Sequence, residues 1–195
     1  MALSKYHQRY KDQSDEEIEK KVQVKEQELL AVFKGISLNT DSDPVRLAVL
    51  GCGDSRFVNY HKIIFEKVLN RRVEVITFDI VTEHLLGELN IFKHDCTLPL
   101  PNSPYDITYG HVLLKFIETE KQWDLIESSY KALCPGGLAI HILDKEEYET
   151  KEKSLSNGYF SVPLEKWEEK LKIEKVKYFK IPIKYGLAFV IQKDK

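Results

Sequence analysis

The stretch Val45-Arg-Leu-Ala-Val-Leu-Gly-Cys-Gly-Asp-Ser55 decides the fold of this chain. Its first six residues form a short apolar run, dense enough to be a strand covered on both faces, as in a parallel sheet. Gly51 and Gly53 then let the backbone turn tightly and leave main chain bare for a ligand. Residues 56–70 repeat apolar side chains at steps of three and four, which predicts a helix. Strand, glycine turn and helix in this order indicate an α/β protein.

Further apolar runs alternate with helical patterns along the rest of the chain. Further strands are expected at residues 73–78, 91–92, 105–109, 138–143, 176–183 and 187–192. Further helices are expected at residues 14–36, 82–86, 119–133 and 164–171. The last two strands are separated only by residues 184–186, too few for a crossover helix, so these strands should be antiparallel. The prediction is a mostly parallel seven-stranded sheet with a C-terminal antiparallel hairpin and helices on both faces.

The length of 195 residues fits one domain with a sizeable core. We expect residues 45–195 to form the α/β core and residues 1–44 to form an N-terminal helical extension. Tyr6 and Tyr10 make the start of this extension a candidate lid over a pocket.

Charge and cysteine content restrict the class of protein. The net charge of -2 disfavours nonspecific binding to nucleic acid, although residues 151–195 hold 11 Lys against 6 acidic residues and could form a local basic face. Cys52, Cys96 and Cys134 form no CxxC pair, so neither a disulfide framework nor a metal site is predicted. No apolar run reaches the ~18 residues of a membrane span. We therefore expect a cytoplasmic protein without a membrane partner; the sequence does not indicate its oligomeric state.

Carboxylates follow two of the predicted strands at the edge where ligands bind in parallel sheets. Asp79 closes the second strand and is placed to accept hydrogen bonds from two adjacent ribose hydroxyls. Asp95 follows the third strand and could accept a hydrogen bond from an exocyclic amine such as that of adenine. Together the two residues predict a nucleoside site.

These residues resemble a known family. The segments Val-Leu-Gly-Cys-Gly-Asp-Ser at 49–55, Asp79, His94-Asp95 and Leu133-Cys-Pro-Gly-Gly-Leu138 are similar to those of the class I S-adenosylmethionine-dependent methyltransferases, with the type 11 branch closest. The resemblance covers residues 14–192. Its most specific part is the junction at residues 130–137, which looks like the segment before the fifth strand of the family's Rossmann-like sheet.

The resemblance implies S-adenosylmethionine as the cofactor and assigns residues to it. Gly51, Cys52 and Gly53 would line its methionine and ribose portion, with Asp54 in the same turn. Asp79 would bind the ribose hydroxyls. Asp95 and Cys96 would flank the adenine, and Gly110 belongs to the segment after the fourth strand that would lie beneath the cofactor.

The expected function is methyl transfer to a small-molecule acceptor. His111 is the candidate general base, because it follows the fourth strand and its ordinary pKa is close to physiological pH; it could equally pack beneath the next helix. Tyr109 could position the acceptor. RNA or protein methylation is an alternative, motivated by the Lys-rich C-terminal region. A noncatalytic cofactor-binding protein is another, because Val49 and Ser55 depart from the family pattern.

A nicotinamide dehydrogenase would also begin with a strand, a glycine turn and a helix. Its fingerprint requires a third glycine at the position of Arg56, and an arginine there would obstruct close packing of helix on strand. The sequence therefore excludes this class.

Overall fold

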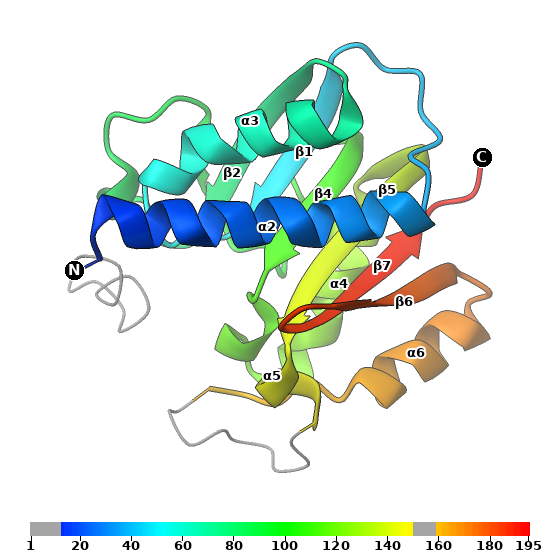
Figure 1. Cartoon of the computed structure of the whole chain (residues 1–195). Helices are drawn as coiled ribbons and strands as arrows, with labels where there is room; N and C mark the ends of the chain where they lie inside the picture. The colour runs from blue at the N-terminus through cyan, green and yellow to red at the C-terminus, as the bar shows by residue number, and fades with distance from the viewer. Residues whose placement is uncertain (1–12, 150–158) are drawn as a thin grey trace.

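The computed structural model describes residues 13–149 and 159–195. These residues form one seven-stranded sheet with helices packed on its faces (Figure 1). The strand order is β3-β2-β1-β4-β5-β7-β6. The strands are β1 (Val45–Leu50), β2 (Val73–Asp79), β3 (Ile91–Lys93), β4 (Tyr105–His111), β5 (Leu133–Asp144), β6 (Lys177–Ile183) and β7 (Gly186–Gln192).

The direction of the strands confirms the predicted sheet. β1 is parallel to β2 and to β4, β2 is parallel to β3, and β4 is parallel to β5. β7 is antiparallel to both β5 and β6, so the final hairpin inserts its second strand beside β5. The carboxyl ends of β1, β2 and β4 therefore lie side by side at one edge of the sheet, which we call the carboxyl edge.

Two long helices cover one face of the sheet (Figure 1). Helix α2 (Asp15–Gly35) begins with a capping box, in which the N–H of Glu17 donates to Oγ of Ser14 and the N–H of Ser14 donates to Oε2 of Glu17. Helix α3 (Arg56–Leu69) is capped by Asn70, whose φ of 51° reverses the chain. Both helices were expected from apolar spacing.

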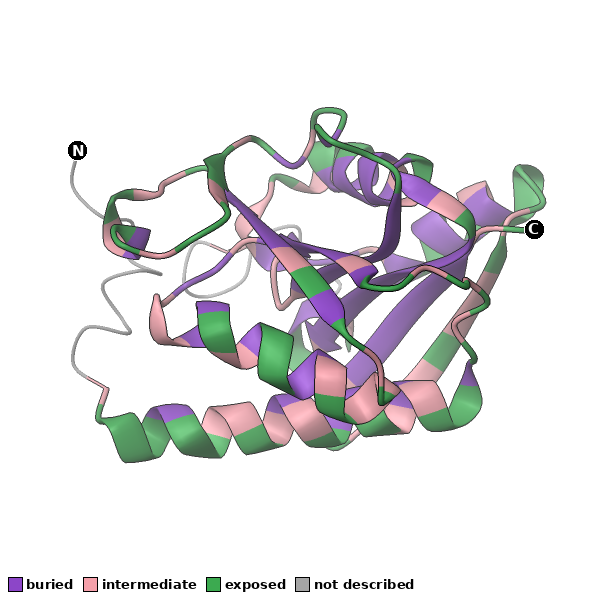
Figure 2. Ribbon diagram, turned by 90° about the horizontal axis from the view of Figure 1, so that it is seen from above, coloured by how far each residue is buried: buried purple, intermediate pink, exposed green. Residues whose placement is uncertain are grey.

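The opposite face carries α4 (Gln122–Lys131) and α6 (Leu164–Ile173). Trp167 of α6 and Phe189 of β7 lie in the same apolar core, together with Ile126 of α4. In Figure 2 the central strands are purple along their length, whereas the long helix α2 alternates purple with pink and green. A sheet covered on both faces leaves its carboxyl edge as the place where polar groups can reach a ligand.

The region before the fifth strand differs from the expectation. Helix α4 ends at Lys131, and β5 already starts at Leu133 and runs through Pro135 to Gly137. Backbone bonds explain the difference, because the N–H of Gly136 donates to the carbonyl of Lys193 and the N–H of Lys193 donates to that of Gly137. The backbone at Gly136 and Gly137 thus belongs to β5, which begins five residues before the expected strand and has a register shift against β4.

Short helical segments follow several strand ends. The segment η1 (Glu83–Leu85) was expected, whereas η2 (Leu114–Phe116) and α5 (Lys145–Glu149) were not. The helix predicted at residues 119–133 is divided into η3 (Thr119–Lys121) and α4. Three-residue segments are too short to show a helical period, which is why apolar spacing could not predict η2.

The described residues lack two kinds of feature. None of the helices in residues 13–149 and 159–195 is long and apolar enough to span a membrane. The same residues hold no cluster of three or more His, Cys, Asp or Glu suited to a metal ion. Tyr6 and Tyr10, the candidate lid residues, lie outside this part of the chain.

Candidate functional site

The glycine turn at residues 51–54 connects β1 to α3 at the carboxyl edge. Gly51 has a φ of 75°, a conformation that favours glycine, and its N–H donates to the carbonyl of Phe78 at 2.7 Å. A β-carbon at Gly51 would lie 2.9 Å from Cδ1 of Leu113, which belongs to the segment after β4. The turn therefore exposes little main chain in this conformation, because Leu113 covers it.

Asp79 lies at the end of β2, where the sequence places it, and its carboxylate faces the glycine turn. Oδ2 accepts the N–H of Cys52 at 2.7 Å, and Oδ1 accepts the N–H of Val81 at 3.0 Å. The residue is 5% exposed. The bond to Cys52 holds the ends of β1 and β2 together and fixes the orientation of the carboxylate.

The other predicted carboxylates are differently placed. Asp54 forms an ion pair with Arg56, with Oδ2 and Nη2 2.8 Å apart. Asp95 is exposed, and its Oδ1 accepts bonds from the N–H and the hydroxyl of Thr97. Cys96 is buried, and burial raises the pKa of its thiol to about 12. The predicted roles of these three residues at the cofactor stay predictions.

Two residues near Asp79 were not expected in the site. Ile80 follows Asp79 and is 60% exposed, so it offers an apolar surface beside the carboxylate. His84 in η1 donates from Nε2 to the carbonyl of Cys52 at 2.6 Å. An apolar residue directly after a strand-ending Asp was visible in the sequence, but the contact of His84 was not, because it depends on how η1 folds back.

A buried polar cluster lies between α2, α3 and β4. It consists of Lys25, Glu28, His61, Tyr109 and His111. Lys25 and Glu28 come from α2, His61 from α3, and Tyr109 and His111 from the end of β4. Tyr109 and His111 were predicted as site residues. In the structure they lie next to Lys25 and Glu28 of α2, which were not predicted as site residues.

Lys25 is the cation of this cluster and is 7% exposed. Burial lowers the pKa of its ammonium to about 8, and Glu28 acts in the opposite direction. Its Nζ lies 5.1 Å from the ring centre of Phe57, and within the described part of the chain no carboxylate lies at ion-pair distance from it. A buried lysine without an anionic partner is unfavourable in the empty protein and marks a place for an anion.

Lys25 also had a signal in the sequence. The apolar face of α2 has buried residues at Ile18, Leu29 and Val32, with Val22 partly buried. Lys25 lies three residues after Val22 and four residues before Leu29, so it belongs to the same face of the helix. A lysine at an apolar position of an amphipathic helix indicates a buried charge.

His111 and Glu28 form a hydrogen-bonded pair in the cluster. Nε2 of His111 lies 3.0 Å from Oε2 of Glu28, and 24% of the histidine side chain is exposed. Burial lowers the pKa of His111 to about 4, with the charge of Lys25 acting in the same direction and Glu28 against it. The imidazole is therefore neutral at physiological pH.

Tyr109 lies deeper than His111. It is fully buried, and burial raises the pKa of its hydroxyl well above the ordinary value. Its hydroxyl makes no hydrogen bond to any other described residue. The predicted positioning of an acceptor by Tyr109 stays a prediction, because in this conformation the residue forms the floor of the cluster.

Two adjoining cavities reach the cluster. The inner cavity has a volume of only about 10 Å³ and is bordered by Gly51, Gly53 and Tyr109. The outer cavity has about 310 Å³ and is bordered by Phe116 and Asp144 among others. Lys25, Phe57 and His111 border both cavities. The outer volume is near the lower limit of ~300 Å³ for small-molecule sites.

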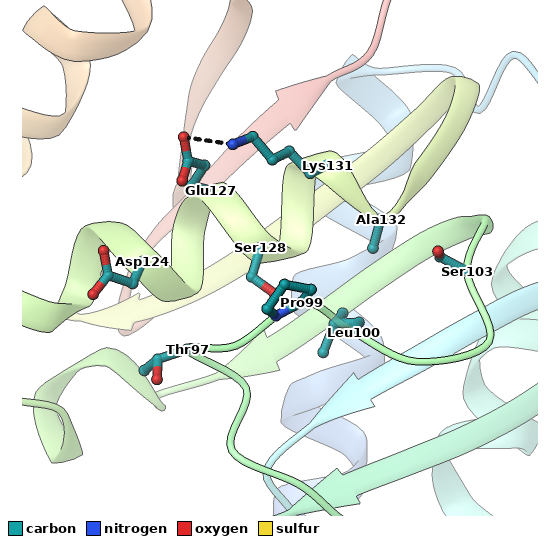
Figure 3. A pocket seen from close by; sticks show the side chains of 9 residues that line it. All are labelled: Thr97, Pro99, Leu100, Ser103, Asp124, Glu127, Ser128, Lys131 and Ala132. Atoms are coloured by element: carbon teal, nitrogen blue, oxygen red, sulfur yellow. Dashed lines mark ion pairs between the residues drawn. The ribbon is translucent and has the colours of Figure 1, made fainter.

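A separate groove lies away from these residues. It has a volume of about 240 Å³ and lies between α4 and the segment that leads into β4 (Figure 3). Lys131 and Glu127 pair at its rim, 3.0 Å apart, and the hydroxyl of Ser128 donates to the carbonyl of Leu98. None of the predicted site residues borders this groove.

The sheet order, with its C-terminal antiparallel hairpin, defines the fold of the class I S-adenosylmethionine-dependent methyltransferases. No protein-family model and no curated protein sequence matches the chain. Its likeness is therefore to solved structures and concerns the fold.

Methyltransferases are among these structures. An S-adenosylmethionine-dependent methyltransferase from Clostridium acetobutylicum has a TM-score of 0.67 at 11% identity, with 98% of each chain covered. The N-methyltransferase NodS from Bradyrhizobium japonicum, in complex with S-adenosyl-L-homocysteine, has a TM-score of 0.55 at 14% identity, covering 96% of this chain and 91% of its own. The sugar N-methyltransferase KedS8 from Streptoalloteichus has a TM-score of 0.62 at 10% identity, covering 100% of this chain and 94% of its own.

The residues present suit the polar groups of S-adenosylmethionine. The buried ammonium of Lys25 suits a carboxylate, Asp79 suits hydroxyl donors, and the exposed side chain of Ile80 suits a flat base. The space is narrow, because Leu113 covers Gly51 and the inner cavity is small. The donor set therefore fits the cofactor, provided that the side chain of Leu113 moves.

Proposed function

We propose that this chain is an S-adenosylmethionine-dependent methyltransferase that acts on a small molecule. The observation that carries the proposal is the buried ammonium of Lys25 beside the glycine turn, in a sheet of the methyltransferase order. Among the described residues no carboxylate forms an ion pair with this ammonium, and a carboxylate-bearing ligand would supply one.

The chain's own residues would hold the cofactor at three points. Lys25 would pair with the carboxylate of its amino-acid part, Asp79 would accept the ribose hydroxyls, and Ile80 would contact the base. The predicted contacts of Cys52, Asp54, Asp95, Cys96 and Gly110 belong to the same proposal. When bound, the cofactor supplies an electrophilic methyl group on sulfonium.

The outer cavity supports a small acceptor. Its volume of about 310 Å³ would accommodate a compact molecule beside the methyl donor, not a folded RNA or protein surface. His111 borders this cavity and is neutral at physiological pH, so it can accept a proton. Positioning of the acceptor in line with the methyl group would supply most of the rate enhancement.

The remaining properties of the protein belong to the same proposal. We treat residues 1–195 as a single methyltransferase domain, with the part before β1 as its N-terminal extension. The three cysteines are unpaired, which supports a reducing compartment such as the cytoplasm.

Calorimetry with S-adenosylhomocysteine tests the cofactor site. The wild-type chain should bind this product, and Asp79→Asn should weaken binding about tenfold or more, because an amide oxygen is a weaker acceptor for two hydroxyls than a carboxylate. Asp124→Asn on the exposed side of α4 is the matched control and should bind normally. Equal binding by wild type and Asp79→Asn would contradict the assignment of Asp79, and no binding by wild type would contradict the function.

Turnover separates the proposal from its alternatives. A methylated product in a small-molecule extract supplied with S-adenosylmethionine would exclude the noncatalytic alternative, which rests on Val49 and Ser55. Product found only in RNA or protein would favour the macromolecular alternative.

A further inference from the structure

The His111–Glu28 pair determines which kind of group a ligand in the outer cavity can present. A neutral imidazole carries a single N–H, and a carboxylate only accepts hydrogen bonds. Nε2 of His111 therefore carries the hydrogen and donates it to Oε2 of Glu28 at 3.0 Å. Nδ1 is left as an acceptor, and its hydrogen bond to Glu28 through Nε2 is the only one that His111 makes with the other described residues. A ligand that completes the site must bring an O–H or N–H group.

The charge of the outer cavity favours a neutral donor over an ammonium group. Three lysines border it, namely Lys21, Lys25 and Lys115, against one carboxylate, Asp144. Lys115 is paired with both Asp144 and Glu147, so the buried Lys25 is the cation that dominates the charge at this cavity. A cationic amine would be repelled by Lys25, whereas a hydroxyl that loses its proton would be stabilised by it.

The shape and surface of the cavity favour a flat, apolar body. Phe57 of α3, Phe116 of η2 and Tyr185 of the turn between β6 and β7 border it. The ring of Phe116 is held edge-on by Tyr159, with ring centres 4.9 Å apart. Aromatic rings prefer such edge and offset contacts with other rings. A volume of about 310 Å³ leaves room for one or two rings.

We propose that the methyl acceptor is a small phenol, a molecule with a hydroxyl group on an aromatic ring, and this inference rests on the proposed function. In the transfer, the phenol oxygen forms a bond to the methyl carbon and the bond from that carbon to sulfur breaks. The electron pair of that bond stays on sulfur. The phenol proton goes to Nδ1 of His111.

A phenol is a better proton donor to His111 than an alkyl alcohol, because its hydroxyl is more acidic. A phenol such as the tyrosine side chain has a pKa of about 10, whereas the pKa of water is about 15.7. A base as weak as His111 can take a proton only from the more acidic hydroxyl at a useful rate. Glu28 acts as a positioning residue, because it keeps the proton on Nε2 and stabilises the imidazolium that forms.

Two phenols of different acidity test this inference. Phenol itself is un-ionised near neutral pH and needs a base, whereas 4-nitrophenol is largely ionised at mildly alkaline pH and does not. The purified full chain is supplied with S-adenosylmethionine and either phenol, and the methyl ether is measured by mass spectrometry. Benzylamine is the cationic comparison and should not be methylated.

The variants His111→Gln and Glu28→Gln should affect the methylation rates of the two phenols differently. We expect His111→Gln to lower the rate on phenol by about 10²- to 10⁴-fold, and Glu28→Gln by about tenfold or more. Both variants should change the rate on 4-nitrophenol little. Glu16→Gln, on the exposed side of the same helix, is the matched control and should leave both rates unchanged.

The possible outcomes show whether this inference or the proposed function is wrong. If S-adenosylhomocysteine binds but neither phenol is methylated, the acceptor assignment is wrong and the methyltransferase proposal stands. If both variants lower the two rates equally, the proton-transfer role of the pair is wrong. Methylation of benzylamine in preference to phenol would also overturn the inference. Failure of S-adenosylhomocysteine to bind contradicts the proposed function itself.

Discussion

A β-carbon at Gly51 would lie 2.9 Å from Cδ1 of Leu113, so the leucine side chain occupies the space over the glycine turn. Gly51 directly follows β1, and Leu113 lies just after β4, which is the neighbouring strand of the sheet. The two residues therefore decide together how much main chain a ligand can reach. Gly51 also borders the inner cavity, whose volume is about 10 Å³.

Shortening Leu113 should open the turn. We expect Leu113→Ala to bind S-adenosylhomocysteine roughly fivefold more tightly, which corresponds to about 1 kcal/mol, because no side chain has to be displaced. The free energy of unfolding should fall by about 1 kcal/mol, since the side chain is partly buried. Calorimetry and urea denaturation measure the two effects. Leu89→Ala, at an exposed position, is the control, and an unchanged affinity in Leu113→Ala would show that Leu113 does not obstruct the site.

Replacing Lys25 by an apolar residue should raise stability and weaken binding. Burial lowers the pKa of Lys25 from 10.5 to about 8, so at neutral pH its charged form destabilises the folded chain by up to about 3 kcal/mol. Lys25→Met should therefore raise the free energy of unfolding by about 1 to 3 kcal/mol at neutral pH. Its affinity for S-adenosylhomocysteine should fall by about 30-fold, equal to about 2 kcal/mol.

The pH dependence gives a second measurement on Lys25. The folded chain releases this proton near pH 8 and the unfolded chain near pH 10.5, so the unfavourable charge is fully present below 8 and absent above 10.5. The stability difference between Lys25→Met and wild type should shrink across this interval. Lys20→Met on the exposed side of α2 is the control. A destabilised Lys25→Met variant with normal binding would refute the role of Lys25.

Glu147 should give the chain an opposite dependence on pH. Its side chain is fully buried in α5, and burial, with a smaller effect of Asp144, raises the pKa of its carboxyl from 4.5 to about 8. Between these values the unfolded chain has lost the proton and the folded chain keeps it, so this residue's contribution to stability falls as pH rises. The loss should amount to at most about 4 kcal/mol.

The variant Glu147→Gln removes this titration. Its free energy of unfolding, followed by urea denaturation from pH 4.5 to 8, should lack the decline that wild type shows. Glu146→Gln, the exposed neighbour, should retain it. Identical slopes for wild type and Glu147→Gln would mean that Glu147 ionises normally.

The Lys-rich C-terminal region should not bind RNA in a salt-sensitive way. Lys180 is paired with Glu168 at 2.7 Å, which reduces the positive charge of the β6 surface. We expect fluorescence anisotropy with a single-stranded RNA to show little binding at physiological salt. Binding that weakens steeply with salt, and that is lost when Lys175, Lys177 and Lys180 are replaced by Gln, would favour the RNA methyltransferase alternative.

The sequence by itself determined the strands, their direction and the carboxyl edge. Apolar runs set the strands, Gly51 and Gly53 set the turn, and the short connection at residues 184–186 set the antiparallel hairpin. These are local properties: each depends on residues within one or two turns of the chain. Asp79 could be placed for the same reason, since a residue that ends a parallel strand lies at the carboxyl edge.

Only the tertiary structure decided the content of the site. Glu28 and His111 are 83 positions apart in the chain, and their bond exists because α2 crosses the sheet at the end of β4. The cover of Leu113 over Gly51 likewise depends on how η2 folds back from β4. Hydrophobic periodicity shows which face of a helix is buried, but it does not show which residue of another element that face meets. Contacts of this kind are fixed by packing between distant segments, and they produced the buried cation, the oriented histidine and the narrow inner cavity.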